Sequence, residues 1–127
     1  MSDSPRPRLR ASLDRSPSAP RRARRLLAGW LSEVDCPDDV KENAVLAVSE
    51  LVTNSIVHTA SAPVVAAAYD DGRLRVEVRD DDPGEPTMLA PGDRIGGYGL
   101  RIIDQVTDAW GWQRSPQGKS VWTELLC

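Results

Sequence analysis

The sequence has few aromatic residues, few cysteines and no long apolar run. It contains four Trp, two Tyr and no Phe among 127 residues, so its core must be built mainly from Val, Leu, Ile and Ala. No apolar stretch approaches the roughly 20 residues that a membrane-spanning helix needs, and the charged start lacks the apolar segment of a secretory signal. The two cysteines, Cys36 and Cys127, suggest neither a metal-ligand pair nor a disulfide framework. We therefore expect a cytoplasmic protein with no membrane segment.

Charge is distributed unevenly along the chain. Residues 1–25 contain eight Arg and two Asp, whereas residues 26–127 carry seventeen acidic and eight basic side chains. A basic arm on an acidic body can bind nucleic acid or an acidic protein. The alternative is a partly disordered tail that leads into a solvent-exposed helix face. We favour this alternative, and do not expect nucleic acid as a partner, because no aromatic residue is interleaved with the arginines to stack on bases.

The hydrophobic pattern predicts a single domain over residues 9–127, preceded by a flexible tail over residues 1–8. Apolar residues recur at helical spacing and then at strand spacing, with turn residues between the segments. The predicted elements are, in chain order, an edge strand over 9–13, helices over 18–34 and 38–59, strands over 63–69 and 74–78, a long loop over 83–97, a helix over 98–106, and strands over 109–114 and 119–125. This order predicts a two-layer α/β (α+β) sandwich, with helices on one face of a mostly antiparallel mixed sheet.

The helix predicted over 38–59 carries a polar stripe beside its apolar stripe. Glu50 and Asn54 are four residues apart, so their side chains lie one above the other. An amide oxygen suits Mg²⁺ when phosphates supply most of the negative charge, and a carboxylate one turn away can accept a proton from a hydroxyl group or water. Taken alone, both residues fit an ordinary exposed helix face better than a binding site. Ser49 and His58 weaken that alternative, because exposed faces usually carry Lys and Glu.

Three further segments contain residues that suit nucleotide binding. Asp80 directly follows an apolar strand, where its carboxylate can accept a hydrogen bond from an adenine amino group. Gly96, Gly97 and Gly99 precede a predicted helix, so that free backbone N–H groups can approach phosphate oxygens. The last segment, Gly118-Lys119-Ser120, opens the final predicted strand.

In this order and spacing, the four segments resemble the GHKL ATPase superfamily, which includes histidine kinases, gyrase B and the Hsp90 chaperone. The short chain looks most like the anti-sigma factor serine/threonine kinases of the RsbW and SpoIIAB type. The resemblance covers about residues 9–126. It implies the GHKL (Bergerat) fold, ATP and Mg²⁺ as cofactors, and assembly into a homodimer. It also implies two partners, a sigma factor and a STAS-domain antagonist that is phosphorylated on Ser or Thr.

The resemblance also implies a role for individual residues. Glu50 would be the general base, Asn54 would hold magnesium, and Asp80 would select adenine. The remaining nucleotide contacts would come from Gly84, Gly96, Gly97, Gly99, Leu100 and Ser120.

One position departs from the family pattern, in which glycines stand two and four residues after the aspartate. Here Asp82 occupies the first of these positions and Gly84 the second. Aspartate can adopt a left-handed conformation, but its charge near the base and phosphates would reduce nucleotide affinity. Two functions are therefore left open. Glu50 favours a kinase, whereas Asp82 favours a nucleotide-sensing module that binds ATP without transferring phosphate.

Overall fold

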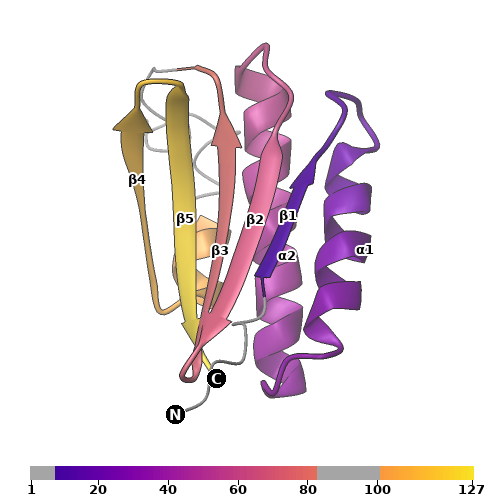
Figure 1. Cartoon of the computed structure of the whole chain (residues 1–127), viewed down its shortest axis with the longest axis vertical. Helices are drawn as coiled ribbons and strands as arrows, with labels where there is room; N and C mark the ends of the chain where they lie inside the picture. Colours follow the sequence, from indigo (N-terminus) through magenta and orange to yellow (C-terminus); the bar gives the residue numbers. More distant parts are fainter. Residues whose placement is uncertain (1–7, 83–100) are drawn as a thin grey trace.

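The computed structural model describes residues 8–82 and 101–127, which form two layers (Figure 1). A five-stranded sheet has the order β1-β2-β3-β5-β4, and each neighbouring pair of strands is antiparallel. Both long helices and the helical residues 101–106 lie on one face of this sheet. The elements are β1 (Arg8–Ser12), α1 (Ala19–Leu31), α2 (Asp38–His58), β2 (Val64–Asp70), β3 (Arg73–Asp80), β4 (Ala109–Ser115) and β5 (Gly118–Leu126). The predicted two-layer sandwich is confirmed, with ladders that are all antiparallel rather than mixed.

The helices follow their predicted bounds with small differences. Helix α1 ends at Leu31 rather than near Val34. Ser18 precedes α1 as predicted, but its hydroxyl lies 2.9 Å from that of Ser16 and caps no backbone N–H group. No helix in the described part of the chain has the length and apolar content needed to cross a membrane. Residues 1–7 of the predicted tail and the loop over 83–97 lie outside the described residues. Arg8, the last residue of the predicted tail, instead begins β1.

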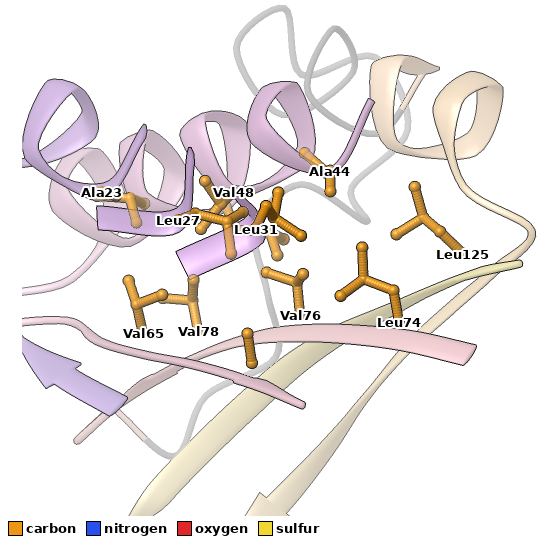
Figure 2. Close-up of a cluster of buried hydrophobic side chains, with 14 of the residues drawn as sticks. Ala23, Leu27, Leu31, Ala44, Val48, Val65, Leu74, Val76, Val78 and Leu125 are labelled. Atoms are coloured by element: carbon orange, nitrogen blue, oxygen red, sulfur yellow. The ribbon is translucent and has the colours of Figure 1, made fainter. Parts of the chain in front are cut away.

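The core lies between the sheet and the helices and is aliphatic, as the lack of Phe predicted. Alternate residues of β3 point toward the helices, and all of them are buried. They meet buried Leu and Val side chains of α1 and α2 (Figure 2). Burial of each such side chain contributes about 1.5–3 kcal/mol. The side chains at the centre of this cluster are Leu27, Leu31, Val48, Val65, Leu74, Val76 and Val78.

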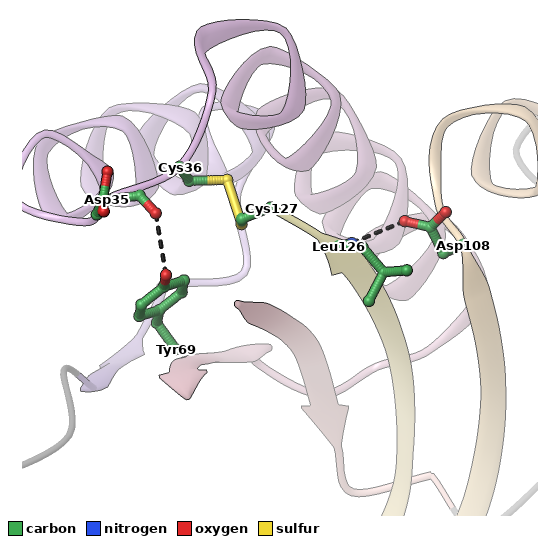
Figure 3. Close-up of a disulfide and its surroundings, with 6 residues drawn as sticks. All are labelled: Asp35, Cys36, Tyr69, Asp108, Leu126 and Cys127. Atoms are coloured by element: carbon green, nitrogen blue, oxygen red, sulfur yellow. Dashed lines mark hydrogen bonds between the residues drawn. A yellow bond between two sulfur atoms is a disulfide. The ribbon is translucent and has the colours of Figure 1, made fainter. Parts of the chain in front are cut away.

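A disulfide joins Cys36, just before α2, to Cys127 at the end of the chain (Figure 3). The two Cα atoms are 4.9 Å apart, within the usual range for a disulfide. Two hydrogen bonds hold the surrounding segments. The amide of Cys127 donates to the carbonyl of Gly72 (2.8 Å), and the hydroxyl of Tyr69 donates to the carbonyl of Asp35 (3.0 Å). The expectation that the cysteines form no disulfide is therefore wrong, because folding brings together two residues whose sequence spacing carries no signal.

We expect reduction of this disulfide to lower the melting temperature by about 10 °C. The bond joins residues 91 positions apart, and cross-links over long loops typically contribute about 2–4 kcal/mol by restricting the unfolded chain. Thermal unfolding with and without dithiothreitol measures the effect. Cys127→Ser should melt with the reduced wild type and show no response to dithiothreitol. An identical melting temperature for oxidised and reduced wild type would contradict the prediction.

Candidate functional site

The parts of α2, β3 and β5 that contain predicted site residues lie at one end of the domain. The second half of α2, which contains Glu50 and Asn54, lies beside the end of β3 and the start of β5 (Figure 1). Asp80 is the last residue of β3 and pairs in register with Lys119 of β5. The fold thus gathers side chains that are far apart in the sequence.

The two flanks of α2 have different surroundings. On one flank, Arg24 of α1 donates to the hydroxyl of Ser49 (2.8 Å), and Arg15 donates to the carbonyl of Ile56 (3.0 Å). Helical geometry places Glu50 and Asn54 on the other side of the buried stripe, on the flank away from α1. Both residues are half-buried. They therefore lie on the side of α2 that faces away from α1 and keep part of their surface exposed.

Asp80 and Lys119 form an ion pair that is almost completely buried. The Lys119 ammonium lies 3.1 Å from Oδ1 of Asp80, and the two side chains are 4% and 5% exposed, respectively. The same ammonium donates to the carbonyl oxygen of Asp82 (3.1 Å), and the Asp82 amide donates to Oδ1 of Asp80 (2.9 Å). Because three interactions converge on the end of β3, the Asp80 carboxylate is held in one position. Lys119 was not identified as a site residue from the sequence, although it lies in the Gly118-Lys119-Ser120 segment that the sequence singled out.

Asp81, the residue directly after β3, is hydrogen-bonded to the loop after α2. The amide of Asp81 donates to the hydroxyl of Ser61 (3.1 Å). Asp82 is not among the residues with positive φ; within the described residues, the non-glycine residue with positive φ is Asp71. The left-handed conformation suggested for Asp82 is therefore not adopted. Instead, the Asp82 backbone bonds to the Asp80–Lys119 pair through both its amide and its carbonyl group.

Ser120 lies on the opposite face of the sheet from Asp80. It pairs with Arg79 in register, and its hydroxyl donates to the carboxylate of Glu77. Burial raises the pKa of Glu77, but the Ser120 hydrogen bond and the guanidinium groups of Arg79 and Arg75 outweigh it and lower that pKa overall. The structure therefore does not bring the Ser120 side chain to the face that carries Asp80; Lys119 takes that place.

A hollow of about 430 Å³ lies at the same end of the sheet. Its lining includes outward-facing residues of several strands, such as Glu77 and Ser120, and also Asp80 and Lys119, but not Glu50 or Asn54. We therefore do not equate it with the site that the α2 residues form. The predicted contacts Gly84, Gly96, Gly97, Gly99 and Leu100 lie outside the described residues.

The chain is similar in sequence to a known protein family. Residues 13–124 match the family described as the histidine kinase-like ATPase domain. The chain belongs to this family. No curated protein matches the chain.

Solved structures show the same fold. The chain is similar to the structure of the RsbU and RsbW domains of Rv1364c from Mycobacterium tuberculosis, with a TM-score of 0.75 and 25% identity over 97% of this chain and 33% of that chain. It is also similar to the histidine kinase domain of the blue-light activated histidine kinase from Erythrobacter litoralis EL346, with a TM-score of 0.53 and 24% identity over 71% of this chain and 46% of that chain. The second similarity shows the fold alone. Our chain spans about a third of the length of the Mycobacterium structure. The resemblance to GHKL domains of the RsbW type is confirmed.

Proposed function

We propose that this GHKL domain binds ATP with Mg²⁺ and acts as an anti-sigma factor with serine/threonine kinase activity. Membership of the histidine kinase-like ATPase family supports nucleotide binding. The proposal is supported by the arrangement of the elements: the second half of α2, which contains Glu50 and Asn54, and the end of β3, which contains Asp80, lie at the same end of the domain. These residues come from two elements and together provide a base, an amide oxygen and a fixed carboxylate.

The residues fit an adenine nucleotide with magnesium. Oδ1 of Asp80 accepts from Lys119 and from the Asp82 amide. No bond to the other oxygen, Oδ2, is formed within residues 8–82 and 101–127, so Oδ2 is the atom that would accept from the adenine amino group. Asn54 would offer an amide oxygen to magnesium, which prefers oxygen ligands. Bound ATP would supply the phosphoryl group, and its phosphates would meet the glycine segment from Gly96 to Gly99.

Glu50 would be the general base of the kinase reaction. It lies one helical turn before Asn54 on the same flank of α2. From there its carboxylate would accept the proton of the attacking Ser or Thr hydroxyl group. Phosphoryl transfer depends mostly on positioning and charge neutralisation, so one correctly placed base beside the metal ligand is sufficient protein chemistry for this step.

The proposed partners are a sigma factor and a STAS-domain antagonist, and we propose a homodimer in the cytoplasm. The RsbU and RsbW domains of the similar Mycobacterium structure support a role in protein–protein regulation. Helix α1 offers a basic surface for such contacts, since Arg21, Arg22 and Arg25 are all exposed. Arg24, by contrast, is bonded to Ser49 and helps to fix α1 on α2.

Calorimetric titration with ATP·Mg²⁺ tests nucleotide binding. We expect the wild type to bind, and Asn54→Ala to bind about tenfold or more weakly in the presence of magnesium, because the loss of a metal-site group typically costs 10–100-fold. Asp80→Asn should also bind more weakly. Asn43→Ala is the matched control, since Asn43 is half-buried near the other end of α2. The absence of ATP binding by the wild type would overturn the proposed function.

A nucleotide-sensing module without kinase activity is the second candidate function. Asp82, in place of the usual glycine, favours it because the residue adds negative charge next to the Asp80 carboxylate. Such a module would bind ATP in the same place and act only through contacts with its protein partners. Transfer of labelled phosphate to a partner protein separates the two candidates.

A further inference from the structure

The buried Asp80–Lys119 ion pair stands where the proposed adenine pocket begins. Removing two charges from water is costly, and a buried ion pair is often no more stabilising than an apolar pair of the same size. Stability is therefore a weak reason for an ion pair at this position. Its location, where the end of β3 pairs with the start of β5 and borders a hollow, favours a role in ligand recognition instead.

The hydrogen-bonding capacity of the pair is only partly used. A lysine ammonium has three N–H donors, and two of those of Lys119 are directed to Oδ1 of Asp80 and the carbonyl of Asp82. Oδ1 of Asp80 also accepts from the Asp82 amide. Within the described residues this leaves one acceptor, Oδ2 of Asp80, and one donor, the third N–H of Lys119. An acceptor and a donor are thus held side by side by a fixed ion pair.

We propose that Lys119 is a specificity-determining residue that reads the ring nitrogen N1 of adenine while Asp80 reads the neighbouring amino group. This inference rests on the proposed ATP binding and extends it to the edge of the base. Adenine presents a donor, the amino group, next to an acceptor, N1, on one edge. The acceptor of Asp80 and the donor of Lys119 complement that edge. In the same orientation guanine presents a carbonyl oxygen and an N–H group, so both contacts would be mismatched.

A purely structural role is the competing explanation. In that case Lys119 would only lock the end of β3 to β5, and its ammonium would never contact the base. The two explanations differ in their response to changes in the ligand. If Lys119 has only a structural role, removing N1 from the nucleotide should leave its affinity unchanged. If Lys119 binds N1, the same removal leaves its N–H group without a partner and should lower the affinity.

Calorimetric titration of the wild type with nucleotide analogues separates the two explanations without altering the protein. We expect 1-deaza-ATP, which lacks N1, to bind about tenfold more weakly than ATP. 7-deaza-ATP should bind like ATP, since N7 lies away from the edge in question. Purine riboside triphosphate, which lacks the amino group, should lose affinity through Asp80. GTP should bind most weakly of the four analogues.

The variant Lys119→Met tests the same contact from the side of the protein. It should bind ATP about tenfold more weakly than the wild type and should no longer distinguish ATP from 1-deaza-ATP. Because Lys119→Met leaves the Asp80 carboxylate buried without its partner, the neutral double variant Asp80→Asn with Lys119→Met is measured beside it, and it too should not distinguish the two nucleotides.

Three results would overturn the inference. Equal affinity of the wild type for ATP and 1-deaza-ATP would show that Lys119 does not read N1, even if neither variant folds. Unchanged or tighter ATP binding by folded Lys119→Met would show that the lysine does not contribute to the pocket. Both results leave the proposed function standing. Failure of the wild type to bind ATP at all would instead overturn the proposed function, and the inference with it.

Discussion

Glu50→Gln should reduce phosphoryl transfer to a STAS-domain antagonist by about 100-fold or more while ATP binding stays close to that of the wild type. The substitution keeps the size of the side chain and removes its ability to accept a proton. General base catalysis typically contributes 10²–10⁴-fold to the rate. Glu50 is assigned no contact with the adenine ring, so ATP affinity should not change. The measurement is the transfer of label from ATP to purified STAS-domain proteins, with nucleotide affinity determined separately by calorimetry.

The matched control for this variant is Glu42→Gln. Glu42 lies on the same helix but is exposed to solvent, so its replacement should change neither transfer nor binding. Full activity of Glu50→Gln would show that Glu50 is not the base. A different result would reject the kinase function: the wild type transfers phosphate to no partner, and Glu50→Gln keeps both its ATP affinity and its regulatory effect. The nucleotide-sensing module would then be the function that the data support.

The elements of this fold could be predicted because their signals are local. The apolar stripe of α2 and the period-two pattern of β3 each repeat within one segment. The hairpin between β2 and β3 is equally local. Asp71 and Gly72 have φ angles of 49° and 76°, as a two-residue type I′ turn requires, and the Asp-Gly pair is a characteristic sequence for that turn.

The arrangement of the site could be predicted only in part, because it depends on the register between distant strands. In a strand, a shift of one residue moves each side chain to the other face. The segment from Gly118 to Ser120 was correctly placed at the start of β5. However, no local signal shows that Lys119 rather than Ser120 faces Asp80. The Cys36–Cys127 disulfide was missed for the same reason, since it follows from long-range folding and not from spacing.

Gly118 affects both the stability of the fold and the geometry of the site. It opens β5 with a φ of +149°, and a Cβ atom there would overlap the carbonyl oxygen of Asp80 and lie 2.7 Å from Cα of Asp81. Both neighbouring groups belong to the backbone, so neither can rotate away as a flexible side chain would. Glycine is therefore required where β5 passes the end of β3, and this close approach sets the position of Asp80.

Gly118→Ala should lower the free energy of unfolding by roughly 3–5 kcal/mol, because backbone strain and steric overlap act together. Urea denaturation measures this change. Gly29→Ala is the matched control: Gly29 lies within α1, and a Cβ there meets nothing within 4 Å, so the variant should gain about 0.5–1 kcal/mol from the better helix propensity of Ala. Any folded Gly118→Ala should also bind ATP weakly, since Asp80 is displaced. If Gly118→Ala matches the wild type in both stability and nucleotide affinity, the end of β3 is not packed against β5 in the way that the proposed adenine contact requires.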